Sequence, residues 1–230
     1  DIPFFGIFGA CSTLAEGIIL SALALEGGQL RRCAVTSSSH NCSAERQYRF
    51  PLEYGGQRTP TAQWTVTGAG AYILDAGAGK GPYVSDVMGG IVKDSKIKDS
   101  ANMGAAMAPA AADTLCRYFK ATDTAATDYD KIITGDLGFE GSSLFAELMS
   151  FEGYDISAVH EDCGKLIYDR KRQDVHSGGS GCGCCAVILG PHFLKKVEKG
   201  ELGSILFMAT GALMNPASIQ QGNSIPAVAH

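Results

Sequence analysis

The feature that most constrains the fold is a strand-turn-helix signal at the start of the chain. Residues Phe4 to Phe8 form an apolar, aromatic run typical of a buried strand, and the small residues Gly9 to Cys11 follow as a sharp turn. Residues Thr13 to Leu25 have the pattern of a helix, and Thr13 with Glu16 fits a capping box. Because strand and helix patterns alternate farther along the chain, the sequence predicts an α/β layered fold.

A second strand signal lies in the middle of the chain. Residues Trp64 to Leu74 and Tyr83 to Val92 have the length and residue types of strands, and a glycine-rich segment separates them. This arrangement predicts that the two strands pair with each other as a hairpin.

The composition is that of one globular domain. The 230 residues are 45% hydrophobic and 19% charged, which is enough apolar material for a large core. The formal net charge is -5 and the pI is near 5.5, so no overall basic field attracts nucleic acid or an anionic membrane. The most apolar stretch, Gly17 to Leu25, is far shorter than the roughly 20 residues that span a bilayer. We therefore expect a soluble chain without a transmembrane segment that does not bind nucleic acid.

The eight cysteines are expected to be reduced thiols. Disulfide frameworks stabilise small secreted domains, whereas this chain is large, rich in core residues and opens without a secretory signal. The spacing of Cys182, Cys184 and Cys185 does not match a pair of zinc-binding motifs, so no metal site is expected.

Cys11 is the strongest single candidate for a functional residue. The turn places it directly before a helix N-terminus, where free backbone N–H groups and the positive end of the helix dipole lower the pKa of a thiol and favour bound anions. A small residue that fills a tight turn is the alternative interpretation of the same position.

Several further motifs occur in one order along nearly the whole chain. They lie at residues 4–13, 38–41, 44–47, 134–138, 161–164, 178–184, 209–213 and 225–230. The first resembles the nucleophile turn of the thiolase and ketoacyl-synthase superfamily, and the rest resemble the stage V sporulation protein AD family of spore-forming bacteria. The resemblance implies a thiolase-like layered fold (αβαβα) that is incomplete at the N-terminus, because family members carry a further N-terminal segment. It also implies a single thiolase-like domain fragment over 1–230, with about 1–62 as the end of the first half and about 63–230 as the second half.

The chain departs from the condensing enzymes of this superfamily at two positions. Those enzymes pair the cysteine with a histidine and with a second histidine or an asparagine, and the match places these positions at Gly135-Asp136 and within Gly179 to Gly183. Neither partner is present there, although condensation needs such groups to stabilise an enolate and its oxyanion. The departures predict a protein that is not an enzyme. His176, a few residues before the glycine-rich loop, stays a candidate to approach the pocket.

The helix N-terminus at Cys11 and the backbone amides of Gly135 to Gly138, Gly179 to Gly183 and Gly211-Ala212 predict a pocket for a small anion. Convergent backbone amides hydrogen-bond carboxylates without a charged side chain. The family resemblance implies non-catalytic binding of dipicolinic acid, an aromatic dicarboxylate, alone or as its calcium chelate, for uptake into the developing spore. It also implies membrane transport proteins of the spore as partners, a homodimer, a peripheral location at the spore inner membrane, and no cofactor. The predicted ligand-binding residues are Cys11, Ser12, Gly135, Asp136, Leu137, His176, Gly179, Ser180, Gly181, Gly211 and Ala212.

Two other classes of function stay open. Cys11 would be the nucleophile of an acyltransferase or condensing enzyme that acts on acyl-coenzyme A. A purely architectural subunit would bind neither ligand and would keep its protein partners.

Overall fold

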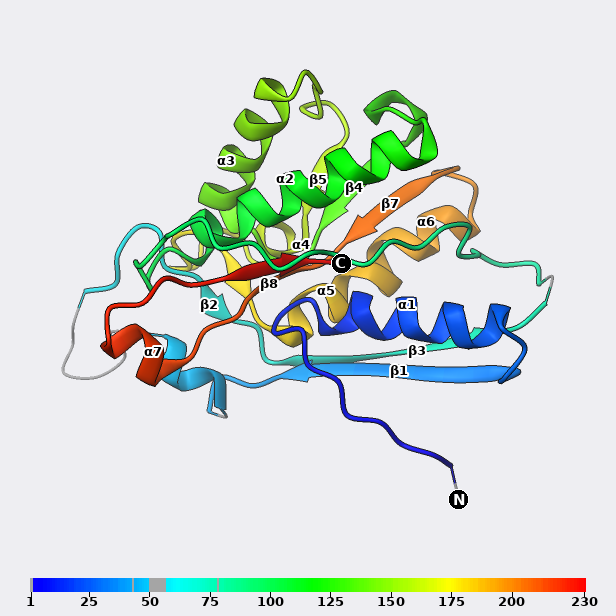
Figure 1. Cartoon of the computed structure of the whole chain (residues 1–230), viewed down its shortest axis with the longest axis horizontal. Helices are drawn as coiled ribbons and strands as arrows, with labels where there is room; N and C mark the ends of the chain where they lie inside the picture. Colours follow the sequence, from blue (N-terminus) through cyan, green and yellow to red (C-terminus); the bar gives the residue numbers. More distant parts are fainter. Residues whose placement is uncertain (1, 43, 50–56, 78) are drawn as a thin grey trace.

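The computed structural model describes residues 2–42, 44–49, 57–77 and 79–230, and these residues form four layers (Figure 1). The first layer is an antiparallel pair of strands, β1 (Arg32–Ser39) and β3 (Gly68–Asp75). Helices α1 (Thr13–Glu26) and α5 (Cys182–Ile188) lie on this pair and form the second layer.

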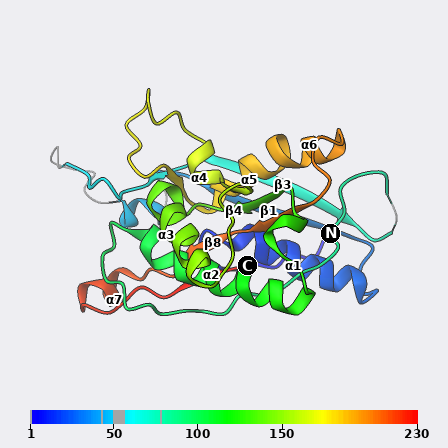
Figure 2. The same cartoon turned by 90° about the horizontal axis from the view of Figure 1, so that it is seen from above.

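The third layer is a parallel sheet in the order β5 (His160–Asp162), β4 (Lys131–Thr134) and β7 (Ile205–Met208). Helices α2 (Met103–Thr122) and α3 (Gly138–Phe151) cover its other face as the fourth layer, as the view from above shows (Figure 2). The strand β8 (Thr210–Ala212) follows β7 and pairs antiparallel with β9 (Ala227–Ala229). The remaining elements are η1 (Ala44–Tyr48), β2 (Trp64–Thr65), η2 (Ala126–Asp128), α4 (Cys163–Leu166), β6 (Gly179–Ser180), the π-helical η3 (Leu189–Leu194), α6 (Lys195–Glu198) and α7 (Pro216–Gln220).

The parallel sheet separates two apolar cores. Ile132 of β4 packs with α2 and α3, whereas its neighbour Ile133 packs with α1, β1 and α5. Successive side chains of a strand point to opposite faces, so a strand that is buried on both faces is apolar at every position. Both isoleucines are fully buried, as expected for a strand that packs on both faces.

The turn before α1 differs from the predicted capping box. The Ser12 hydroxyl donates to the Gly9 carbonyl at 2.6 Å, and the Thr13 hydroxyl donates to the Ala10 carbonyl at 2.6 Å. Ser12 is the N-cap residue, and its side chain does not cap a helix amide. The prediction that Thr13 and Glu16 form a capping box is therefore wrong, because both hydroxyls stabilise the turn that carries Cys11.

Two predicted strands lack strand partners in the described part of the chain. Residues Phe4 to Phe8 lie outside every described strand, and Phe4 is 88% exposed. Residues Tyr83 to Val92 are also outside the sheets, and the predicted hairpin with Trp64 to Leu74 is wrong because β3 pairs with β1 instead. Both segments have strand-forming residues, but a strand needs a neighbour to satisfy its backbone.

The eight cysteines are all free, as predicted. Within the described ranges, no helix is both long enough and apolar enough to cross a membrane.

Candidate functional site

Four side chains from three parts of the chain meet at the N-terminus of α1. Cys11 precedes this helix, Asp136 follows β4, and Ser180 and Cys182 flank Gly181 at the start of α5. The Cys11 Sγ atom lies 3.8 Å from the Ser180 Oγ atom, and the Cys182 thiol donates to the Ala10 carbonyl at 3.1 Å. We call Cys11, Asp136, Ser180 and Cys182 the Cys11 cluster.

Asp136 is the buried centre of this cluster. Its carboxylate accepts hydrogen bonds from the Ser180 hydroxyl at 2.7 Å, the Gly181 amide at 3.0 Å and the Thr210 hydroxyl at 3.0 Å. The residue is 1% exposed, and this burial raises the pKa of the carboxyl group although the three donors act in the opposite direction. Asp136 thus fastens the segments after β4, β6 and β7 to one point.

The thiol of Cys11 is held in its protonated form. Its hydrogen bond with Cys182 raises the pKa well above the usual value, and burial and the negative charges of Asp136 and Glu45 act in the same direction. The sequence-based prediction that the helix N-terminus lowers this pKa is wrong, because the hydrogen bond with Cys182, burial and the nearby acidic groups all raise it. A thiol with a raised pKa is a weak nucleophile at neutral pH.

Glu45 borders the Cys11 cluster, and the sequence analysis did not single it out as a site residue. Its carboxylate accepts a hydrogen bond from the Cys182 amide at 3.3 Å and forms an ion pair with Arg49 at 3.1 Å. Burial raises the pKa of Glu45, and Arg49 partly offsets this effect. The four-residue spacing of Glu45 and Arg49 signals an ion pair, but only the folded chain shows that the pair lies beside two thiols.

Several backbone amides that were expected to hold an anion already have acceptors within the protein. Asp162 accepts from the Leu137 amide at 2.9 Å and from the Gly138 amide at 3.0 Å. The Gly181 amide donates to Asp136, and the Gly135 amide donates to the Met208 carbonyl at 3.1 Å. The expectation that these amides converge on a ligand is therefore wrong, because internal carboxylates and a strand carbonyl occupy them.

The other predicted site residues have structural positions around the cluster. Ser12 is fully buried and turned toward Gly9. Gly179 pairs with Trp64 between β6 and β2, and Gly211 and Ala212 pair within β8 and β9. Gly211 also lies against the turn before Cys11, since a Cβ atom at Gly211 would be 2.3 Å from the Gly9 carbonyl oxygen.

His176 is not brought into the Cys11 cluster. Its Nδ1 atom lies 2.6 Å from the Thr59 carbonyl oxygen, and its Nε2 atom lies 2.8 Å from an Asp174 carboxylate oxygen. These contacts hold the ring next to a surface loop, so the structure gives His176 no contact with Cys11, Asp136 or Ser180.

The Cys11 cluster has two partly exposed thiols, those of Cys11 and Cys182. The Ser180 hydroxyl beneath them is fully buried and donates to the buried carboxylate of Asp136. The described residues include no group of three or more His, Cys, Asp or Glu side chains placed to hold a metal ion. The arrangement favours hydrogen bonding to a small polar ligand over attack on it.

Comparison with solved structures defines the class of the fold. OleA of Xanthomonas campestris, in its H285N variant with cerulenin, aligns with 98% of this chain and 62% of its own at a TM-score of 0.57 and 14% identity. The tetronic acid condensing enzyme AbyA1 aligns with 96% of this chain and 63% of its own at a TM-score of 0.52 and 13% identity. The fold is therefore thiolase-like, as predicted, and at these identities the similarity concerns the fold alone.

Sequence comparison then gives the family. Residues 1–230 match the family described as stage V sporulation protein AD. The chain is 45% identical over 229 residues to the stage V sporulation protein AD of Bacillus subtilis (strain 168), and the match covers 100% of this chain and 67% of that protein. The chain belongs to the stage V sporulation protein AD family, and it spans about two thirds of the length of this relative.

Proposed function

We propose that this chain binds dipicolinic acid (pyridine-2,6-dicarboxylic acid) without catalysis, for uptake of this compound into the developing spore. Its membership of a sporulation protein family supports a role in spore formation. The observation that carries the non-catalytic part is the protonated thiol of Cys11, which contacts Ser180 and Cys182. A protonated thiol is suited to hydrogen-bond a polar ligand, and it leaves the ligand chemically unchanged.

The charges around the site define the form in which the ligand binds. Asp136 and Glu45 both lie next to the thiol of Cys11, and Arg49 is already paired with Glu45. A bare dicarboxylate would meet like charges at short range, which is unfavourable in a partly buried site. We propose that this repulsion is removed in one of two ways. Either Asp136 and Glu45 bind protons, or the ligand enters as its calcium chelate.

The partners and the location belong to the same proposal. The chain would act at the periphery of the spore inner membrane with membrane channel proteins, and as a homodimer. The dimer is supported by the aromatic side chains of the first residues, because Phe4, Phe5 and Phe8 are between 73% and 88% exposed. Exposed apolar patches of this kind are typical of protein interfaces.

A thermal melt with and without excess dipicolinic acid tests the binding proposal, because a ligand selective for the folded state raises its stability by mass action. We expect a saturable rise in melting temperature that is reduced in Ser180→Ala and Cys11→Ala. Ser157→Ala, at an exposed position, is the matched control and should keep the full rise. Titrations with and without calcium distinguish the free acid from the chelate. A melting temperature that dipicolinic acid does not change under either condition would contradict the proposal.

An acyltransferase or condensing enzyme is the second candidate, and the position of Cys11 before a helix in a thiolase-like fold is the observation that favours it. In that case the Cys11 sulfur would attack a thioester carbonyl, the acyl group would move to Cys11, and coenzyme A would leave as the thiol. Intact mass spectrometry after incubation with acyl-coenzyme A would show the acyl adduct, and Cys11→Ala would remove it. The raised pKa of Cys11 predicts that no adduct forms at neutral pH. An architectural subunit would give no response to either ligand and would keep its partners.

A further inference from the structure

A cluster of basic side chains lies at α4 and on the loop that follows it. Its members are Lys165, Arg170, Lys171 and Arg172, in a chain whose formal net charge is -5. Residues 169–174 are all exposed, and the loop projects from the body of the protein in the view from above (Figure 2). We call these four residues the basic cluster.

Two of the four cations are held at one aromatic ring. The guanidinium carbon of Arg170 lies 4.3 Å from the centroid of the Phe139 ring, and the Nζ atom of Lys165 lies 5.6 Å from it. The face of an aromatic ring attracts a cation, so both contacts are favourable. Phe139, at the start of α3, therefore keeps two like charges close together.

No carboxylate neutralises the basic cluster within the part of the chain that the structure describes. None of its side chains forms an ion pair there, and Asp174 is paired with Arg58 at 2.7 Å and lies 2.8 Å from the His176 Nε2 atom. The Asp169 carboxylate accepts a hydrogen bond from the Lys171 backbone amide at 3.0 Å. Neighbouring like charges repel each other, so an anionic partner would relieve a repulsion that the folded chain otherwise keeps.

We propose that the basic cluster docks this protein onto an anionic phospholipid surface, and the inference rests on the proposed location at the periphery of the spore inner membrane. Three of the four cations are exposed residues of one projecting loop, which suits a flat layer of phosphate groups. The planar guanidinium groups of arginine match the geometry of phosphate oxygens. Leu166 is 41% exposed and places an apolar side chain next to Lys165. Basic and apolar side chains together are typical of contacts at a membrane surface.

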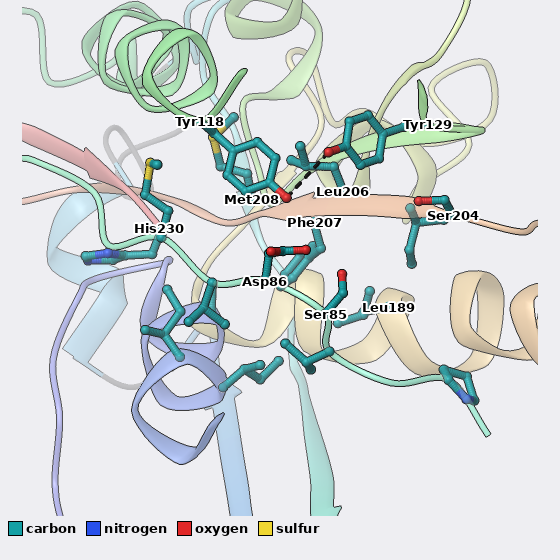
Figure 3. Close-up of a pocket in the computed structure, with 18 of the residues that line it drawn as sticks. Ser85, Asp86, Tyr118, Tyr129, Leu189, Ser204, Leu206, Phe207, Met208 and His230 are labelled. Atoms are coloured by element: carbon teal, nitrogen blue, oxygen red, sulfur yellow. Dashed lines mark hydrogen bonds between the residues drawn. The ribbon is translucent and has the colours of Figure 1, made fainter. Parts of the chain in front are cut away.

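The apolar groove between α1, α2, β3 and β7 is the rival surface for a membrane contact (Figure 3). It has a volume of about 480 Å³, and the hydroxyl groups of Tyr118 and Tyr129 lie 3.4 Å apart in its wall. Its lining includes Tyr83, which is 87% exposed, and contains no residue of the basic cluster. Membrane binding through this groove would depend on apolar burial, so it would not require anionic lipid and would persist at high salt.

Co-sedimentation with lipid vesicles tests the proposal in the intact protein. We expect binding to vesicles of phosphatidylcholine with phosphatidylglycerol, and much weaker binding to vesicles of phosphatidylcholine alone. Raising the salt concentration from about 0.1 M to about 1 M shortens the Debye length from about 10 Å to about 3 Å, so most of the binding should be lost.

A double variant locates the contact. Lys171→Gln with Arg172→Gln should weaken binding to the anionic vesicles at least about tenfold, because each cation near such a surface adds to the affinity. Neither side chain has a hydrogen bond or an ion pair with the described residues, so the melting temperature should be that of the parent protein. Lys98→Gln with Lys195→Gln removes the same charge from other exposed positions and should leave vesicle binding unchanged.

Three results would overturn the proposal. The first is equal binding to the two kinds of vesicle, which would indicate the apolar groove. The second is a double variant at Lys171 and Arg172 that binds as tightly as the control variant. The third is a protein that binds soluble polyglutamate through these residues but does not bind the anionic vesicles, which would indicate an acidic protein partner.

The thermal melt with dipicolinic acid separates this proposal from the proposed ligand. The double variant does not alter the Cys11 cluster, so it should keep the full rise in melting temperature. Vesicle binding by a protein that dipicolinic acid does not stabilise would support docking and contradict the ligand. A rise in melting temperature without vesicle binding would overturn docking alone.

Discussion

Replacement of Asp162 by alanine is expected to destabilise the protein strongly. Asp162 is 1% exposed, and its carboxylate accepts from the Leu137 amide, the Gly138 amide and the Thr134 hydroxyl at 2.7 to 3.0 Å. Leu137 and Gly138 are themselves buried, so the variant leaves both amides without an acceptor and out of reach of bulk water. Each unsatisfied buried group costs about 1–3 kcal/mol, which gives about 2–6 kcal/mol for the two amides. This is a large part of the roughly 5–15 kcal/mol that stabilises a typical domain.

Asp130 offers a matched control for this variant. Its carboxylate also accepts from two backbone amides, those of Gly203 and Ser204, but the residue is exposed. In Asp130→Ala, water can replace the lost acceptor, so we expect a much smaller loss of stability than in Asp162→Ala. Urea unfolding followed by circular dichroism measures both free energies of unfolding. An Asp162→Ala loss no larger than that of Asp130→Ala would refute the view that Asp162 is the acceptor that these amides require.

The same carboxyl group predicts a pH dependence of stability. Burial raises the pKa of Asp162 to about 7 in the folded state, above its ordinary value of about 4. The folded state then binds the proton more tightly than the unfolded state, so this contribution is fully present below about pH 4 and is lost as the pH rises through 7. Asp162→Ala should reduce the decrease in unfolding free energy between about pH 5 and pH 8.

Three further predictions concern the Cys11 cluster. Gly211→Ala places a Cβ atom 2.3 Å from the Gly9 carbonyl oxygen, so we expect a stability loss of about 1–3 kcal/mol by urea unfolding and weaker dipicolinic acid binding by calorimetry. Without calcium, the affinity for dipicolinic acid should increase as the pH falls, because Asp136 has a raised pKa and becomes neutral; Asp136→Asn should flatten this dependence. Alkylation by iodoacetamide, followed by peptide mass spectrometry, should be slower at Cys11 than at the exposed Cys42, and a faster reaction at Cys11 would contradict the protonated thiol.

The parts of the fold that were predictable from sequence are those fixed by local pattern. The helix after Cys11 was recognisable because its residue pattern matches one element, and the structure confirms it as α1. Pairing partners were not predictable in the same way. Residues Tyr83 to Val92 have the side chains of a strand, but the choice of neighbour depends on segments that are distant in sequence.

The candidate site shows the same division. The family resemblance predicted that Cys11, Asp136 and Ser180 lie in one pocket, and the structure brings these three residues together. The electrostatics of the site were not predictable, because the helix dipole is a local property of the turn. The pKa of Cys11 is raised by the hydrogen bond with Cys182, by burial, and by the charges of Asp136 and Glu45, which come from other elements. The local argument therefore gave the wrong direction for this pKa.

The two buried aspartates have a consequence for the kinetics of binding. Asp162 accepts a hydrogen bond from the Gly138 amide after β4, and Asp136 accepts one from the Gly181 amide. Both segments are therefore already ordered before a ligand binds. The proposed ligand would then meet a surface that already has its final shape, and no loop-ordering entropy would reduce the affinity. Association should follow a single exponential whose rate rises linearly with ligand concentration, without the plateau that a preceding conformational step would impose.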